Sequence, residues 1–182
     1  MFYAGIGSRQ TPLEIRKKMT EYAGRLEKIG YILRSGGANG ADLAFENGVL
    51  SKKEIYLPFH GFNNNKSMLF HIKKECYEIA SKLHPVWNNL GDFVKKAMAR
   101  NVYQVLGYEL DKPSEFVLCY TPDGAKTKEE CTKDTGGTGM AIKIASQYNI
   151  KIFNFKNKND LEEFEIFLNN LEKKVKKGFR DK

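Results

Sequence analysis

Three glycine-bearing loops contain the residues of this sequence whose types and spacing could do chemistry. The first spans residues 5–9 (GIGSR), the second residues 35–42 (SGGANGAD) and the third residues 135–140 (TGGTGM). Glycines let the backbone amides approach a ligand closely, and the free amides and dipole at a helix N-terminus favour negative charge. All three loops are therefore candidate sites for a phosphate group.

The first loop combines a tight turn with a cation. Gly5 and Gly7 permit the turn, Ser8 follows it, and Arg9 can form two hydrogen bonds to a phosphate or a carboxylate. A lone G-x-G pattern is a weak signal, so a purely structural turn remains the alternative for this loop.

The second and third loops each lie between a predicted strand and a predicted helix. Their candidate ligand-binding residues are Ser35, Gly36, Gly37, Ala38, Asn39 and Asp42 in the second loop and Thr135, Gly136, Gly137, Thr138 and Gly139 in the third. Neither is a Walker A loop, because no Gly-Lys-Ser/Thr follows, and a structural tight turn is the alternative for both. We expect the two loops to face one ligand from two sides, with residues 7–9 as the floor of the site.

Apolar runs and turn residues predict the elements that position these loops. Strands are expected at about 2–6, 31–34, 54–58, 115–120 and 151–155, and helices at about 11–28, 41–49, 67–83, 91–107, 138–148 and from 160 onward. This alternation predicts an α/β fold: a Rossmann-like, doubly wound, mostly parallel sheet with helices on both faces. In such sheets the ligand binds beyond the carboxyl ends of the strands, where all three loops fall.

Length and composition predict one globular domain over residues 1–182, with a basic tail from about Lys173 that we expect to fray. The formal net charge of +8 favours anionic partners. The three cysteines and three histidines lack metal-ligand spacing, so we assign neither a metal nor a cofactor. We see no signal peptide and no apolar run long enough to cross a membrane, and we therefore expect a cytoplasmic protein.

The segments YAGIGSR, SGGANGADLAFENG and TGGTGMAIKIA resemble the SLOG superfamily of Rossmann-like proteins. That superfamily includes DNA-processing protein A (the Smf family) and the Lonely Guy phosphoribohydrolases. The likeness covers about residues 1–155 and is strongest to small stand-alone members, which are often encoded by phages. SGGANGAD is similar to a loop of DNA-processing protein A that contacts nucleic acid phosphates, and TGGTG is similar to the PGGxGT loop of Lonely Guy enzymes, which holds a nucleotide phosphate.

The resemblance also implies phosphoribohydrolase chemistry, but this sequence lacks the glutamate that the Lonely Guy enzymes use. Lonely Guy enzymes carry a glutamate three residues after the threonine of their loop, whereas Met140 and Lys143 occupy the aligned positions here. Glu46 is the candidate replacement as acid or base, and Arg100 corresponds loosely to the catalytic arginine of those enzymes. The alternative is that Asp42 supports the N-terminus of its helix and that Glu46 is solvated or paired with a lysine.

Two further segments have both a binding and a packing interpretation. Residues 63–65 (NNN), together with Phe59 and Phe62, form a polar and aromatic loop that could stack on a base and read its edge, or could be an ordinary turn. Trp87 is predicted to be a packing anchor. The apolar residues between about 91 and 110 exceed what one sheet face needs, so we also predict a homodimer that pairs through this helix.

Three functions remain open from the sequence. The first is binding, and hydrolysis at an N-glycosidic bond, of a nucleoside phosphate, an ADP-ribose-like molecule or a signalling nucleotide. The second is single-stranded DNA binding similar to that of DNA-processing protein A. The third is a protein that holds a nucleotide without turning it over.

Overall fold

The computed structural model describes residues 1–180 and contains one five-stranded sheet. The strands are β1 (Phe2–Gly5), β2 (Ile32–Ser35), β3 (Lys53–Ile55), β4 (Phe116–Cys119) and β5 (Lys151–Asn154), in the order β3-β2-β1-β4-β5. Every neighbouring pair is parallel. This confirms the predicted α/β class and places the switch in strand order between β1 and β4.

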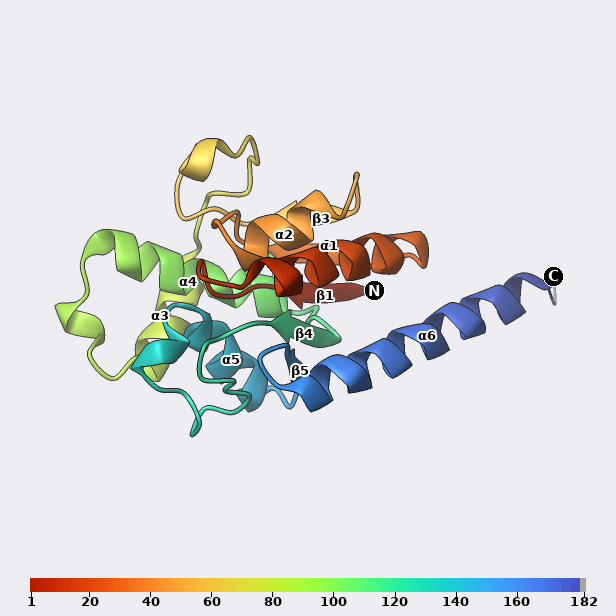
Figure 1. The fold of residues 1–182 in the computed structure, drawn as a ribbon. Helices are drawn as coiled ribbons and strands as arrows, with labels where there is room; N and C mark the ends of the chain where they lie inside the picture. The colour runs from red at the N-terminus through yellow and green to blue at the C-terminus, as the bar shows by residue number, and fades with distance from the viewer. Residues whose placement is uncertain (181–182) are drawn as a thin grey trace.

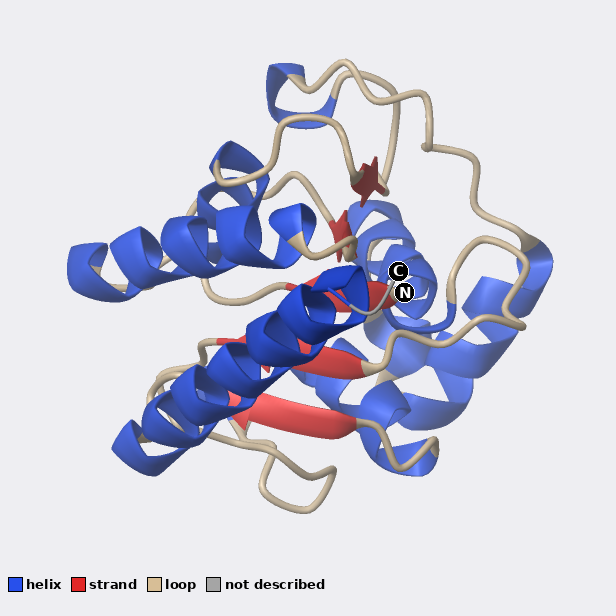
Figure 2. Ribbon diagram, turned by 90° about the vertical axis from the view of Figure 1, so that its right-hand side faces the viewer, coloured by secondary structure: helices blue, strands red, loops and turns tan. Residues whose placement is uncertain are grey.

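The described residues form six α-helices, which surround the sheet (Figures 1 and 2). They are α1 (Leu13–Lys28), α2 (Ala41–Asn47), α3 (Lys74–Leu83), α4 (Asp92–Leu106), α5 (Thr138–Gln147) and α6 (Lys158–Arg180). One apolar core contains residues of α1, α2 and α6, and the other contains residues of α3, α4 and α5. The sheet therefore has helices on both faces, as the doubly wound arrangement requires.

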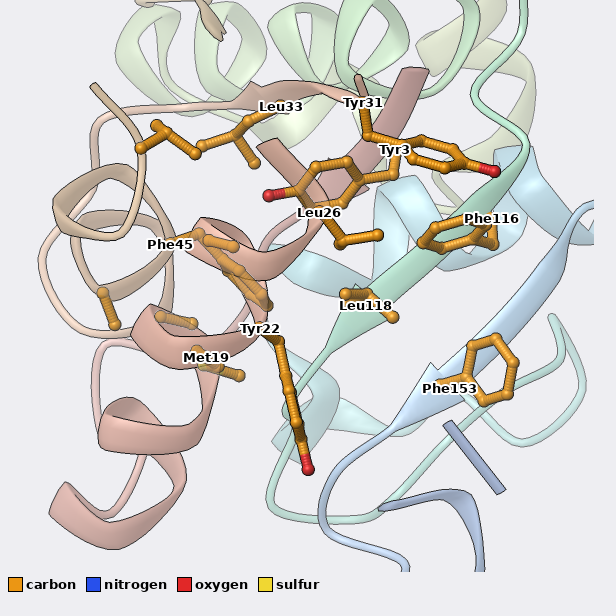
Figure 3. Packing of buried hydrophobic residues seen from close by; sticks show 14 of the residues in the cluster. Tyr3, Met19, Tyr22, Leu26, Tyr31, Leu33, Phe45, Phe116, Leu118 and Phe153 are labelled. Carbon is orange, nitrogen blue, oxygen red and sulfur yellow. The ribbon is translucent and has the colours of Figure 1, made fainter. Parts of the chain in front are cut away.

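The strands supply both cores by alternation. Tyr3 and Ala4 of β1 lie in opposite cores, and so do Phe116 and Val117 of β4, because successive side chains of a strand point to opposite faces. The core on the α1, α2 and α6 side is rich in aromatic rings (Figure 3), with Tyr3 stacked on Phe116 at a centroid distance of 5.8 Å. The core on the opposite face includes the buried Cys119, and Trp87 packs against it as predicted.

The helix predicted over residues 67–83 begins only at Lys74, so its first part was wrong. Ser67 explains the difference: its amide donates to Asn65 Oδ1 (2.9 Å) and its hydroxyl donates to the Ile55 carbonyl (2.6 Å). Local side-chain bonds of this kind compete with the helical ladder. The segment instead runs beside the end of the sheet, where Leu69 forms a bridge with Tyr56.

The C-terminal helix also differs from the prediction. It begins at Lys158, two residues before Asp160, and the Asp160 carboxylate accepts from the Asn154 amide (3.0 Å). The helix continues through the basic run from Lys173 to Arg180, and Figure 1 shows α6 extending well beyond the rest of the fold. Within the described residues, no helix is both long and apolar enough to span a membrane.

Candidate functional site

A cleft of about 600 Å³ opens at the carboxyl ends of the strands. Its lining includes ten of the residues predicted from the sequence, which come from all three glycine-bearing loops and from α4. They are Gly7, Ser8, Arg9, Ala38, Asp42, Arg100, Thr135, Gly136, Gly137 and Thr138. The loops that follow β1 and β4 meet here because these neighbouring strands form the switch point of the sheet.

The third loop lines the cleft with backbone amides that have no hydrogen-bond partner in the described chain and with open space beside its glycines. Gly137 is the N-cap of α5, and a Cβ atom built on Gly136 or Gly137 would meet no atom within 4 Å. The amides of Gly137 and Thr138 form no hydrogen bond within residues 1–180. Asn101 of α4 fixes the loop by donating to the Gly137 carbonyl (2.9 Å). Free amides at the start of a helix attract an anion.

Asp123 holds the third loop in shape, and sequence reasoning missed it. Its Oδ2 atom accepts from the Thr132 hydroxyl (2.8 Å) and from the Thr135 hydroxyl, while the Thr132 amide donates to Thr135 Oγ1 (2.8 Å). Burial would raise the pKa of Asp123, but hydrogen bonds from Thr135, Thr132 and Thr121 outweigh burial and lower the pKa well below its usual value. The available signal was an aspartate in the loop that follows β4, at the carboxyl edge of the sheet.

The second loop is tied to α4 by a buried ion pair. Asp42 Oδ2 lies 3.6 Å from Arg100 Nη1, and Asp42 also accepts from the amides of Gly7 (3.1 Å) and Ala38 (3.4 Å). Burial raises the pKa of Asp42 to about 6, although Arg100 and the two amides act in the opposite direction. Burial likewise lowers the pKa of Arg100, and its Nε atom has no hydrogen-bond partner in the described chain.

The glycines of the second loop face protein atoms rather than the cleft. A Cβ atom on Gly36 would lie 1.2 Å from Arg100 Nη1, so the guanidinium occupies the space that a side chain would need. A Cβ atom on Gly37 would lie 2.8 Å from Leu57 Cδ2. Gln104, with its amide oxygen turned toward these groups, accepts from Arg100 Nη1 at 2.6 Å and from the Gly36 amide at 2.9 Å. These glycines serve packing inside the chain.

The remaining predicted residues of the loops lie behind the lining or away from it. A Cβ atom on Gly5 would meet Leu33 and Phe45 in the core, and the buried Ser35 hydroxyl donates to the Gly5 carbonyl (2.6 Å). Gly139 lies in the first turn of α5, where a Cβ atom would meet Thr135, and Asn39 is exposed. None of these four is among the residues that surround the cleft in the described chain.

Glu46 is not brought to the cleft, although Arg100 is. The Glu46 carboxylate accepts from Lys53 Nζ (3.2 Å) and from Asn65 Nδ2 (3.0 Å), and 14% of its side chain is exposed. The structure thus matches the alternative in which Glu46 pairs with a lysine. The two residues considered as catalytic partners do not share one site.

Helix α4 provides a wall of the cleft that the sequence interpretation assigned to a dimer interface. Phe93, Ala97, Arg100 and Gln104 recur at helical spacing and all line the cleft. The last turns of α4 contain the apolar residues Val102, Tyr103, Val105 and Leu106, which are buried inside the chain itself. These four residues are therefore not available for an interface, whereas Phe93 at the start of α4 is exposed, and the homodimer stays a prediction.

Aromatic rings flank the cleft on the side of this wall. Phe62 and Phe93 both line it, with ring centroids 6.2 Å apart, and Phe59 contacts both rings at 5.4 and 6.1 Å. Phe59 and Phe62 were considered from the sequence, whereas the contribution of Phe93 was not. Within the described residues, no group of three or more His, Cys, Asp or Glu side chains could hold a metal ion.

Comparison with known proteins gives a likeness in fold. No family model matches the sequence, and no curated protein matches it. The fold is similar to a solved structure of DNA processing protein A from Helicobacter pylori, which is described as having a unique single-stranded DNA binding mode. The TM-score is 0.53 and the identity 16%, with 100% of this chain and 81% of that chain covered. At this identity, the likeness shows the fold.

Proposed function

We propose that the cleft binds a nucleotide and that the start of α5 holds its phosphate. One observation carries the proposal: the free amides of Gly137 and Thr138 open on the cleft where a Cβ atom on Gly136 or Gly137 would meet nothing. A phosphate oxygen can then approach the backbone closely and face the positive end of a ten-residue helix. The exposed Arg9, which also lines the cleft, adds a guanidinium group that can form a bidentate pair with a phosphate.

The rest of the cleft suits the other parts of a nucleotide. Its volume of about 600 Å³ falls within the range of about 300–1,000 Å³ that is usual for small-molecule sites. The lining combines the free amides and Arg9 with the apolar side chains of Phe62, Phe93 and Met98, which can contact a base. Such a combination of a few polar groups with apolar walls is typical of ligand pockets.

Binding, rather than hydrolysis, is the activity that we propose. An N-glycosidic hydrolase needs an acid or base within hydrogen-bond reach of the reacting bond. The sequence candidate, Glu46, is engaged by Lys53 and Asn65 and does not line the cleft. Asp42 lines it, but its two oxygens are engaged by Arg100 and by the amides of Gly7 and Ala38. Asp134, the other carboxylate on the lining, belongs to the segment just before the proposed phosphate site. A protein that holds a nucleotide without cleaving it fits this arrangement.

Single-stranded DNA is a second candidate ligand, favoured by a separate observation. The solved structure with a similar fold is a DNA processing protein described by its single-stranded DNA binding mode. The net charge of +8 is suited to a polyanion. One nucleotide of a strand would then occupy the cleft, with its phosphate at the same amides. A free nucleotide and a DNA strand would thus be bound by the same groups in the cleft. They differ in whether the neighbouring phosphates of the strand add affinity.

Calorimetric titration of AMP and of a short single-stranded oligonucleotide tests the proposal. We expect Gly137→Ala to weaken binding of the preferred ligand at least about tenfold, because a methyl group would occupy the space of the phosphate. Gly91→Ala is the matched control. Gly91 is also a helix N-cap with open space around it, but it does not line the cleft. Unchanged affinities in Gly137→Ala would contradict the proposal.

Salt dependence separates the two ligands. Between about 50 mM and about 200 mM salt, a protein that contacts several DNA phosphates loses affinity by orders of magnitude, whereas contact with a single phosphate gives a shallow slope. Tight oligonucleotide binding with a steep slope, together with weak AMP binding, would select single-stranded DNA. The reverse result would select a free nucleotide.

A further inference from the structure

Three aromatic rings touch one another beside the cleft, which two of them line, and two of the three are exposed. Phe59 is 43% exposed and Phe93 52% exposed, while Phe62 is half-buried and packs against the core. Single apolar residues on a surface are ordinary. Three rings in mutual contact from two separate segments form a continuous apolar surface, and two of them, Phe62 and Phe93, line the same cleft as the free amides of the third loop.

The loop that carries Phe59 and Phe62 is fixed by its own asparagines. Asn63 Nδ2 donates to the Gly37 carbonyl (3.0 Å), and Asn65 Nδ2 donates to Glu46 Oε2 (3.0 Å). These bonds tie the loop to the second glycine-bearing loop and to α2. They also use one of the two side-chain N–H donors of Asn63 and one of the two of Asn65 inside the chain.

On this basis, which rests on the proposed function, we propose that Phe62 and Phe93 form a stacking wall for the nucleobase of the bound nucleotide, and that the wall accepts the base by its face without selecting its identity. Every base has a π face, so stacking on aromatic rings tolerates any sequence. Phe62 and Phe93 line the same cleft as Gly137 and Thr138. A nucleotide whose phosphate is bound at these amides would therefore place its base against the rings.

The wall predicts that the base adds affinity to that provided by the phosphate and the sugar. AMP and CMP should both bind more tightly than ribose 5-phosphate, which keeps the phosphate and the sugar but has no base. Purine and pyrimidine nucleotides should differ from each other by less than either differs from ribose 5-phosphate. Stacking of one base typically contributes at least about fivefold in affinity.

Calorimetric titration of these three compounds against wild type, Phe93→Ala and Phe93→Trp tests the wall. Phe93 is exposed, so its removal should leave the fold intact, as circular dichroism will verify. We expect Phe93→Ala to weaken AMP and CMP at least about fivefold and to leave ribose 5-phosphate unchanged, while Phe93→Trp retains nucleotide affinity. Tyr148→Ala is the control, because Tyr148 is 50% exposed at the far end of α5 and does not line the cleft.

Each remaining outcome counts against the inference. If ribose 5-phosphate binds as tightly as AMP and CMP, there is no base-stacking wall, although the phosphate site stands. If AMP and CMP differ by more than either differs from ribose 5-phosphate, the base is read rather than only stacked. If Phe93→Ala changes the particle mass in light scattering instead of nucleotide affinity, the rings are an interface between copies. If none of the compounds binds wild type, the proposed function fails with the inference.

Discussion

The second and third glycine-bearing loops have similar sequences and opposite surroundings. Residues 35–40 (SGGANG) and 135–139 (TGGTG) both lie between a strand and a helix at the carboxyl edge of the sheet, although the helices that follow them, α2 and α5, cover opposite faces. In the second loop, the space of the missing Cβ on Gly36 is filled by the Arg100 guanidinium. In the third, the space beside Gly136 and Gly137 is empty and opens into the cleft.

This difference separates two reasons for a glycine. A glycine can be required because other parts of the same chain pack against its backbone, as Arg100 does at Gly36. It can also leave room for something outside the chain, which is how we interpret Gly137. Glycine content alone does not distinguish the two, whereas the atoms nearest to the absent side chain do.

The largest expected effect contrasts one substitution in each loop. Gly36→Ala should lower the free energy of unfolding by about 3 kcal/mol or more, because the new methyl group overlaps Arg100 and displaces it from Asp42. Gly137→Ala should change it by no more than about 0.5 kcal/mol, because its backbone is already helical and the methyl group meets open space. Urea denaturation of both variants measures this. Equal losses would remove the distinction between the loops.

The contributions of Asp42 and Asp123 to the free energy of unfolding should change with pH in opposite directions. The pKa of Asp42 is raised from 3.8 to about 6, so its contribution to stability is present at acid pH and is lost as the pH rises between these values, by about 2 kcal/mol. The pKa of Asp123 is lowered, so its contribution is present above about pH 4 and is lost as the pH falls below that value.

Urea denaturation of Asp42→Asn and Asp123→Asn against pH isolates these contributions. The advantage of wild type over Asp42→Asn should be larger at about pH 4.5 than at about pH 7. The advantage over Asp123→Asn should stay constant between those values and shrink toward about pH 3. Parallel curves for the two variants would show that the loops are supported in the same way.

A smaller effect concerns the first loop. Arg9→Ala should weaken nucleotide binding by about 1.5 kcal/mol, the low end for a hydrogen bond to a charged group, because Arg9 is exposed at the rim. If the ligand is DNA, the slope of log affinity against log salt should also fall by about one. Calorimetry at two salt concentrations measures both quantities. An unchanged affinity would limit the site to the third loop and α4.

The smallest expected effect is at Thr138. Its hydroxyl makes no hydrogen bond in the described chain and lies on the cleft beside the free amides. Thr138→Ala should therefore weaken nucleotide binding by about 0.5–1.5 kcal/mol, as expected for one neutral hydrogen bond, without destabilising the fold. Calorimetry and thermal unfolding together separate these effects. A large loss of stability would instead assign Thr138 to packing.

The sequence by itself determined the fold class, the five strands and the glycine-bearing loops that line part of the cleft. Strand and helix periodicity are local properties, and loops after parallel strands must gather at one edge of the sheet. Residues 7–9 and 135–138 could be placed there because each follows a strand along the chain. The glycine pattern marked these segments without showing which glycines are open.

Only the tertiary structure decided the rest, because it depends on contacts between residues far apart in the chain. Arg100 occupies the space beside Gly36, Lys53 and Asn65 engage Glu46, and Asp123 fixes Thr135. Local pattern carries no information on which distant side chain fills a gap or engages a carboxylate. The apolar residues in the last turns of α4 are buried inside the chain. Periodicity alone could not show whether they pack inside the chain or against a second copy.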